Sequence, residues 1–173
     1  MENSKKNLQS HEAVKKLQKL VEEIRICMFC TLPSQSNAET RPMATMKADD
    51  QGILWFFTHC TSPKIQDLQQ DQDVQLIYAH PGKDSFLTVY GKASLMNDRD
   101  KIEELWNPMV KAWFPQGKDD PNICIIRVAP QEAYYWDNES NKMVEFLGII
   151  TAAITGKSKL AGSKEGELDV QSH

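Results

Sequence analysis

Apolar residues near the start of the chain recur at three- and four-residue intervals, and after residue 25 the period changes. Residues 11–25 carry apolar side chains separated by Lys and Glu, the pattern of an amphipathic helix, with Ser10 as a candidate N-cap. The apolar positions of this helix are Val14, Leu17, Val21 and Ile24. Three β-rich runs follow between clusters of Asn, Asp, Gly, Pro and Ser: ICMFCTL, RPMATMKA and ILWFFT. The change of period predicts one helix followed by a β-meander.

More strands are predicted after a second, shorter helix. Ser62-Pro63-Lys64 combines a capping residue with a proline suited to the first helical turn, and so predicts a helix start. The runs 74–80 and 85–96 have strand composition, and the Pro-Gly-Lys-Asp sequence of residues 81–84 predicts a hairpin turn between them. We therefore expect two further strands in the same sheet.

The last third of the chain predicts one more helical region and the closing strands. Residues 98–114 place apolar side chains on one helical face, although Pro108 should interrupt the helix because it has no N–H to donate. Residues 123–129 and 133–136 predict strands, and residues 143–155 predict a final strand or short helix. The whole pattern predicts a mainly β fold, a barrel with flanking helices and six to seven antiparallel strands, closed to hide its edges.

Length and charge narrow the classes of protein. A chain of 173 residues with 40% hydrophobic content favours one domain, and its net charge of −4 provides no basic field for nucleic acid. No segment has the apolar length needed to cross a membrane, so we expect a cytoplasmic protein. We expect a flexible N-terminus over residues 1–9, a folded domain over 10–155 and a disordered tail over 156–173, which is poor in large apolar residues.

Cysteine and histidine spacing does not predict a metal site. The pair Cys27 and Cys30 forms one CxxC sequence, whereas Cys60 and Cys124 are isolated and no second CxxC or paired histidine completes a zinc site. We expect reduced, mostly buried thiols rather than a disulfide framework. The four histidines are scattered, and His59 is the one that lies near a candidate ligand site in the sequence.

The sequence contains one candidate phosphate site. It lacks GxGxxG and P-loop motifs, but a helix start at Ser62 and Lys64, preceded by Thr58 at a strand end, offers N–H groups, hydroxyls and a cation. Arg41 opens the preceding strand, so antiparallel pairing could add a second cation beside Thr58. An ordinary capped helix start and an exposed strand-edge arginine would account for the same residues without a ligand.

The order of these segments resembles a known family. A helix, an RPMATM strand, a WFFT strand, a Ser-Pro-Lys helix start and a strand containing YGKA are similar to the pyridoxamine 5'-phosphate oxidase-like split-barrel flavoproteins. The later run WFPQGKDDPNICIIRVAPQEAYYWD resembles the general stress protein 26 branch of that family. The resemblance covers residues 10–155 and implies an FMN-binding split barrel, with FAD as the alternative cofactor.

The resemblance also implies a set of cofactor-binding residues and a homodimer with flavin at its interface. The residues it assigns to the ribityl chain and ring are Arg41, Pro42, Met43, Ala44, Thr45 and Met46. Those that complete the ribityl and phosphate site are Phe57, Thr58, Ser62 and Lys64. Trp113 and Trp136 would reach the flavin from the partner chain as flat aromatic walls, with core packing as an equal alternative.

The departures from the family pattern concern catalysis. In the true oxidases a lysine closes the strand that here ends at Met46, and an Arg-Leu-His-Asp-Arg-like run follows the tryptophan matching Trp136, where this chain reads DNESNKMVEF. We therefore expect little vitamin B6 phosphate oxidase activity. We expect a flavin-dependent oxidoreductase of a small molecule in a stress-related role, although no catalytic acid or base is identified. The alternatives are a non-catalytic protein that binds or senses flavin or a related cofactor, and a structural dimer with a vestigial site.

Overall fold

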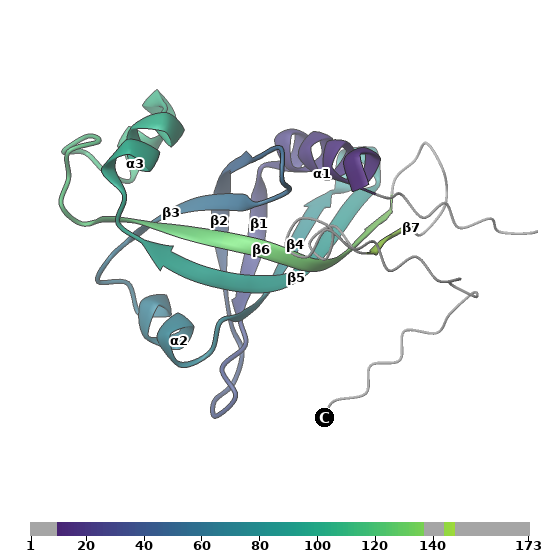
Figure 1. Ribbon diagram of the computed structural model, residues 1–173, viewed down its shortest axis with the longest axis horizontal. Helices are drawn as coiled ribbons and strands as arrows, with labels where there is room; N and C mark the ends of the chain where they lie inside the picture. Colours follow the sequence, from purple (N-terminus) through teal and green to yellow (C-terminus); the bar gives the residue numbers. More distant parts are fainter. Residues whose placement is uncertain (1–9, 137–143, 148–173) are drawn as a thin grey trace, which may run out of the picture.

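The computed structural model describes residues 10–136 and 144–147 of the chain (Figure 1). The predicted flexible N-terminus, residues 1–9, and the predicted tail, residues 156–173, lie outside the described residues. The helices are α1 (Ser10–Ile24), α2 (Lys64–Gln70) and α3 (Arg99–Leu105), with 3-10 helices η1 (Pro81–Lys83) and η2 (Pro108–Ala112). The strands are β1 (Ile26–Thr31), β2 (Glu39–Ala48), β3 (Leu54–His59), β4 (Asp73–His80), β5 (Ser85–Met96), β6 (Ile123–Trp136) and β7 (Val144–Leu147).

The described strands form one antiparallel sheet that closes on itself. Its order is β3-β2-β1-β4-β5-β6-β7, and a further pairing of β3 with β6 makes the first six strands a barrel. Long β5 and β6 run side by side along the barrel, and β7 pairs with the end of β6 (Figure 1). The prediction of a mainly β barrel with flanking helices is confirmed.

The barrel interior is filled by alternate residues of its strands and by the apolar face of α1. Phe29 and Phe56 meet edge to face inside it, with ring centroids 5.3 Å apart. Leu17 of α1 is completely buried in the same cluster, as the three- and four-residue spacing predicts. The helix itself begins at Ser10, one position earlier than the predicted N-cap implies. This interior cluster supplies most of the apolar burial that stabilises the barrel.

Gly91 marks the bend where β5 and β6 shift register. A Cβ atom at Gly91 would lie 2.4 Å from the carbonyl oxygen of Ala129, closer than side-chain atoms approach backbone. The pairing changes between Tyr90 and Gly91, with Pro130 opposite the glycine. The close approach of the two strands therefore requires glycine at this point.

A second hydrophobic cluster lies outside the barrel, against β3 and β6 and beneath α3 and η2. It consists of Ile53, Trp55, Phe57, Ile102, Leu105, Val110, Phe114, Ile123 and Ile125. The run predicted as one interrupted helix is divided here, because α3 ends at Leu105 and η2 begins at Pro108. The break leaves Met109 and Trp113 more than half exposed, so the predicted apolar face is only partly buried.

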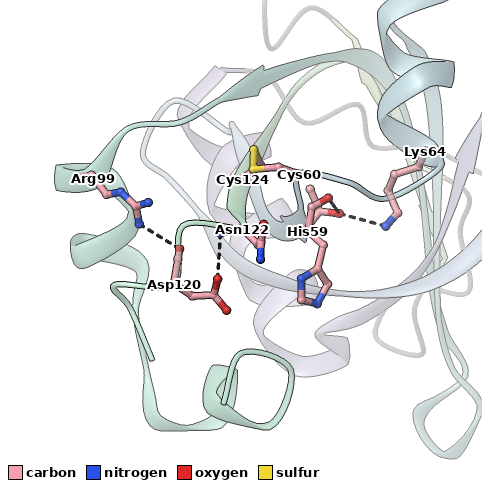
Figure 2. The surroundings of a disulfide bond; sticks show 8 residues. His59, Cys60, Lys64, Arg99, Asp120, Asn122 and Cys124 are labelled. Atoms are coloured by element: carbon pink, nitrogen blue, oxygen red, sulfur yellow. Dashed lines mark hydrogen bonds between the residues drawn. A yellow bond between two sulfur atoms is a disulfide. The ribbon is translucent and has the colours of Figure 1, made fainter. Parts of the chain in front are cut away.

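The expectation of four reduced thiols is wrong for two of the cysteines. Cys60 and Cys124 form a disulfide, with 5.1 Å between their Cα atoms, whereas Cys27 and Cys30 are free and buried (Figure 2). The closing pair of strands accounts for the bond: Cys124 of β6 stands opposite Thr58 of β3, two residues before Cys60. A separation of 64 residues gives no sign of this contact in the sequence.

Two further findings bear on the class of protein. None of the described helices combines the length and apolar character needed to span a membrane. Within the same residues, no group of three or more His, Cys, Asp or Glu side chains is placed to hold a metal ion.

Candidate functional site

A pocket of about 290 Å³ lies against the outer wall of the barrel, between β2, the end of β3, the start of α2 and η2. Its lining residues are Ile26, Pro42, Met43, Ala44, Met46, Phe57, Thr58, His59, Lys64, Val110, Trp113 and Phe114. Most of these side chains are apolar, and the polar ones gather where β3 meets α2. The pocket thus has an apolar body and one polar end.

Lys64 dominates the polar end. Its Nζ donates to the hydroxyls of Thr58, at 3.0 Å, and Ser62, at 2.8 Å. Burial of the Lys64 side chain lowers its pKa, and the positive charge of Arg41 lowers that pKa further. Within the described residues, no carboxylate lies close enough to pair with this ammonium group. The result is a half-buried cation and two hydroxyls, the donor set that suits a phosphate or another small anion.

The turn between β3 and α2 brings these three residues together. The N–H of Ser62 donates to the His59 carbonyl at 2.9 Å, and the N–H of Ile65 donates to the Ser62 carbonyl at 2.9 Å. Pro63 takes the N-cap position with no side-chain hydrogen bond, so the predicted Ser62 hydroxyl cap is absent. The Ser62 hydroxyl instead accepts from Lys64. The Ser62 side chain therefore takes part in the polar cluster and does not cap the helix.

Arg41 stands near this cluster but is occupied by other groups. Its Nη1 donates to the Thr31 hydroxyl at 3.0 Å and its Nη2 to a Glu39 carboxylate oxygen at 2.9 Å. A carboxylate oxygen of Asp67 lies 3.7 Å from the same Nη2. The predicted set of Arg41, Thr58, Ser62 and Lys64 is therefore divided. Thr58, Ser62 and Lys64 converge through hydrogen bonds, whereas Thr58 and Lys64 are the members of the set that line the pocket.

Strand β2 supplies one wall of the pocket. Pro42, Met43, Ala44 and Met46, four of the six β2 residues that the resemblance assigns to the flavin, line the pocket. Met43 also belongs to the barrel interior, and the buried Thr45 hydroxyl hydrogen-bonds to the Tyr78 hydroxyl at 2.7 Å. Thr45 therefore lies behind the pocket wall, because successive residues of a strand point to opposite faces.

Aromatic side chains form the opposite wall. The ring of Phe114 meets Phe57 at 6.4 Å and the exposed His59 at 4.4 Å, both between centroids. Trp113 lines the pocket of its own chain, whereas the resemblance implied a contribution from the partner. Trp136 does not line the pocket; it lies on β6 opposite Phe86. Of the two predicted tryptophans, Trp113 therefore lies at the pocket within a single chain and Trp136 does not.

Four lining residues were not predicted as ligand contacts: Ile26, His59, Val110 and Phe114. Phe114 is the last residue of the predicted helical region 98–114, next to Trp113. The local sequence pattern therefore gives no reason to predict that it lines a pocket. The signal that identifies Val110 is Pro108, which ends the preceding helix and redirects η2 across the end of β3. Ile26 reaches the pocket because β1 pairs with β2 at Ala44.

A closed antiparallel barrel of six strands with a ligand pocket on its outer wall defines a split β-barrel protein. The chain matches the family described as pyridoxamine 5'-phosphate oxidase like over residues 12–159, and it belongs to that family. The resemblance seen in the sequence, including the general stress protein 26 branch, is confirmed.

Relatives place the chain more closely within the family. It is 31% identical to the protein bli-3 of Neurospora crassa over 127 residues, which are 68% of this chain and 61% of bli-3. The match therefore spans less than two thirds of that relative.

Solved structures agree on the fold. A Clostridium acetobutylicum protein related to general stress protein 26 superposes with a TM-score of 0.67 at 21% identity, covering 80% of this chain and 96% of its own. The general stress FMN/FAD binding protein of Xanthomonas citri superposes with a TM-score of 0.63 at 28% identity, covering 90% of this chain and 96% of its own.

Proposed function

We propose that this protein binds FMN in the pocket on the outer wall of the barrel, with the phosphate at Lys64. The observation that carries the proposal is the half-buried Lys64 ammonium, which hydrogen-bonds to two hydroxyls and has no carboxylate partner among the described residues. A buried cation of this kind is costly without an anion, and a phosphate group would supply the charge. The X. citri relative, described as an FMN/FAD binding protein, supports the same ligand class.

The remaining lining residues suit the rest of a flavin. Ala44 and Met46 of β2 present small and flexible apolar surface, and Phe57 and Trp113 present flat aromatic surface on the other side. In this proposal Thr58, Ser62 and Lys64 hold the phosphate. FAD would use the same groups but offers phosphates with less charge each, so FMN is the better match to the half-buried ammonium group and its two hydroxyls.

A bound flavin supplies hydride and electron transfer, and we propose that the protein uses it to oxidise or reduce a small molecule in a stress-related role. The chain's own part is to bind and orient the ring. Among the described lining residues, His59 and Lys64 are the side chains that carry an acid–base group, and Lys64 already hydrogen-bonds within the polar end. A protein that holds flavin without turnover is the second candidate, favoured by this shortage of proton donors.

We also propose a homodimer, because a broad apolar face adjoins the pocket. The face is built from apolar residues that stand opposite one another on neighbouring strands. On β1 and β2, Ile26 stands opposite Ala44 and Met28 opposite Pro42. Met28 also stands opposite Ile77 of β4, and Phe86 of β5 stands opposite Trp136 of β6. The large side chains among them are exposed by 56% (Ile26), 42% (Met28), 37% (Ile77), 38% (Phe86) and 38% (Trp136). None is charged, and Ile26 belongs to both face and pocket. A second copy seated here would cover the face and bring its Trp136 toward the flavin.

The absorption spectrum tests the ligand. Purified protein, or protein mixed with FMN and desalted, should show flavin bands near ~370 and ~450 nm. Bleaching of those bands by NADPH or NADH would favour the oxidoreductase over a protein that only stores flavin. FAD that competes better than FMN would correct the cofactor. A colourless protein with no affinity for either flavin would contradict the proposal.

Sedimentation tests the dimer. Wild-type protein should sediment as a dimer at micromolar concentration, and Ile77→Glu should shift it to monomer because a charge would be buried at the centre of the face. Gln51→Glu, at an exposed turn, adds the same charge elsewhere and should leave the dimer intact. A wild-type protein that remains monomeric would contradict this part of the proposal.

Vitamin B6 phosphates are not the expected substrates. In a fluorometric assay for pyridoxal phosphate, the flavin-loaded protein should show little or no turnover, since the cations that orient such a substrate are missing from the sequence. Robust turnover would show that other groups take their place.

A further inference from the structure

The Cys60–Cys124 disulfide joins strand β6 to the turn between β3 and α2, which contributes the polar end of the pocket. Cys60 lies between His59, which lines the pocket, and Ser62, which receives a hydrogen bond from Lys64. Cys124 stands opposite Thr58, the other hydroxyl of the cluster. Figure 2 shows the disulfide beside His59 and Asn122, with Lys64 farther along the chain at the start of α2. The bond and the polar cluster thus share one short segment of chain.

The two pairs of cysteines differ in their access to solvent. Cys27 and Cys30 are buried, and burial raises the pKa of Cys27 to about 12, so this thiol remains protonated and unreactive. Cys60 and Cys124 are each only half-buried, so this pair is less enclosed than Cys27 and Cys30. The less enclosed pair of cysteines is therefore the one whose chain neighbours and strand partners, His59 and Thr58, line the pocket.

We propose that the Cys60–Cys124 pair is a redox-sensitive modification site that sets the affinity of the pocket for the phosphate end of its ligand. The inference rests on the proposed function, because the regulated site is the one assigned to the FMN phosphate. The disulfide form binds tightly and the dithiol form binds weakly.

Both directions of the switch use simple thiol chemistry. A dithiol reductant attacks one sulfur, forms a mixed disulfide and is resolved by its own second thiol, so that Cys60 and Cys124 gain two electrons and two protons. In the reverse direction, hydrogen peroxide converts one thiolate to a sulfenic acid with loss of hydroxide. The second thiol then displaces water from the sulfenic acid and forms the disulfide.

The physical basis is the unequal support of the two cysteines. Cys124 is held in β6 between Ile123 and Ile125, both completely buried, so its backbone has little freedom to move. The turn that contains Cys60 is half-buried or exposed throughout residues 60–63. Reduction removes the covalent link between the turn and β6, and the less enclosed turn gains the freedom that the link had restricted.

Loss of the bond also lowers the preorganisation of the turn. After reduction, the turn stays joined to this part of the chain by the hydrogen bond from the Cys60 N–H to the carbonyl of Asn122, just before β6, at 2.8 Å, and by the pairing of His59 with Ile123. A more flexible turn holds Ser62 and Lys64 less firmly in the unbound protein. Ligand binding must then restrict the turn, and the lost conformational entropy weakens the affinity. We expect reduction to weaken FMN binding on the order of tenfold, within the usual range of coupling between two sites.

Linkage requires a reciprocal effect that needs no mutation. If the disulfide form binds FMN about tenfold more tightly, saturating FMN must make the disulfide about tenfold harder to reduce. That factor corresponds to about 30 mV in the two-electron potential. A glutathione redox titration with and without FMN, followed by thiol alkylation and mass spectrometry, measures the shift directly.

The binding experiment compares FMN titrations of the full chain before and after reduction by a phosphine. The dissociation constant should rise about tenfold on reduction, as the coupling range suggests. The double variant Cys60→Ser, Cys124→Ser should bind as weakly as reduced wild type and should not respond to the phosphine. Cys30→Ser, which removes a buried thiol outside the turn, should respond as wild type does.

The outcomes separate the inference from the proposed function. Equal affinities in both redox states, or four alkylatable thiols in protein purified under air, would overturn the inference and leave flavin binding intact. No FMN binding in either state would overturn the proposed function and the inference with it. If the serine variant does not fold, wild type in its two redox states still decides the question.

Discussion

Two cations stand at the same end of the barrel, and their surroundings differ sharply. Arg41 donates to Thr31 and Glu39, and Asp67 lies 3.7 Å away, so its charge is balanced by carboxylates. Lys64 donates to two hydroxyls, and within the described residues no carboxylate is near enough to balance its charge. The sequence predicts both as phosphate ligands. In the structure, Arg41 is already paired with carboxylates, whereas Lys64 is placed to bind an anion from outside the chain.

The difference shows that the number of positive residues near a pocket does not measure its capacity for an anion. The carboxylates of Glu39 and Asp67 cancel the field of Arg41 at short range, although Arg41 still lowers the pKa of Lys64. Of these two cations, Lys64 is the one whose charge no described carboxylate balances. Because Lys64 is half-buried, solvent and salt screen its attraction for a bound anion less than they would at the surface. Four predictions test this assignment.

The largest effect is expected when the uncancelled charge is removed. Lys64→Met keeps most of the side-chain volume and deletes the ammonium group, so FMN affinity should fall about 10- to 100-fold, as for the loss of a charged hydrogen bond. Quenching of FMN fluorescence on titration measures the change. Lys111→Met removes one positive charge from an exposed position on η2 and should leave the affinity within about twofold, as for a screened surface charge.

If Lys64→Met and Lys111→Met have equal effects, long-range charge rather than contact explains the binding. Such a result would place the phosphate elsewhere in the pocket and would remove the contrast between Lys64 and Arg41.

A somewhat smaller effect is expected from pH, because a neutral amine still donates hydrogen bonds. Burial, and then the charge of Arg41, lowers the pKa of Lys64 below its ordinary value of 10.5. The phosphate prefers the protonated amine, so FMN affinity should be greatest below this lowered pKa and should fall as pH rises through it. The decline should therefore begin at a lower pH than an ordinary lysine would allow.

Binding isotherms across the alkaline range measure this decline. Lys64→Met provides the control, because any remaining pH dependence in that variant belongs to the ligand or to other groups. A wild-type affinity that stays constant up to pH 10.5 would show that Lys64 is not a ligand of the phosphate.

The third prediction concerns the hydroxyls that distinguish Lys64 from Arg41. Thr58 is almost completely buried, and Thr58→Val preserves its shape while removing the hydroxyl that accepts from Lys64. FMN affinity should fall about three- to tenfold, as for a neutral hydrogen bond. Thr61→Val makes the same replacement at an exposed position of the same turn and should have no effect. A loss in both variants would indicate a general disturbance of the turn.

Much of the fold was predictable because the signals are local. The apolar spacing of Val14, Leu17 and Val21 defines α1, and Pro108 ends the helical run before η2 as its missing N–H requires. The Cys60–Cys124 bond was not predictable. It depends on the pairing of β3 with β6, two strands far apart in the sequence whose contact no local pattern encodes.

The candidate site divides along the same line. Thr58, Ser62 and Lys64 lie within seven residues, and the turn that joins β3 to α2 brings them together as predicted. Arg41 stands apart from these three because its partners come from β1 and α2 as well as from its own strand, and the sequence does not show those partners. Phe114 was missed because its position depends on how η2 packs over β3, which the sequence pattern does not specify.

The smallest effect is expected from Arg41 itself. Arg41→Ala removes a cation whose charge Glu39 and Asp67 already balance, so FMN affinity should change by less than about threefold, the scale of a screened charge. Loss of Arg41 also removes one of the two causes that lower the pKa of Lys64, so the alkaline decline in affinity should move to higher pH. Titrations at neutral and alkaline pH measure both effects, and Glu39→Gln serves as the converse variant. Removal of this carboxylate frees Arg41 and should strengthen FMN binding slightly.

If Arg41→Ala instead weakens binding as much as Lys64→Met, Arg41 must exchange its carboxylates for the phosphate when FMN binds, and the two cations act as one site.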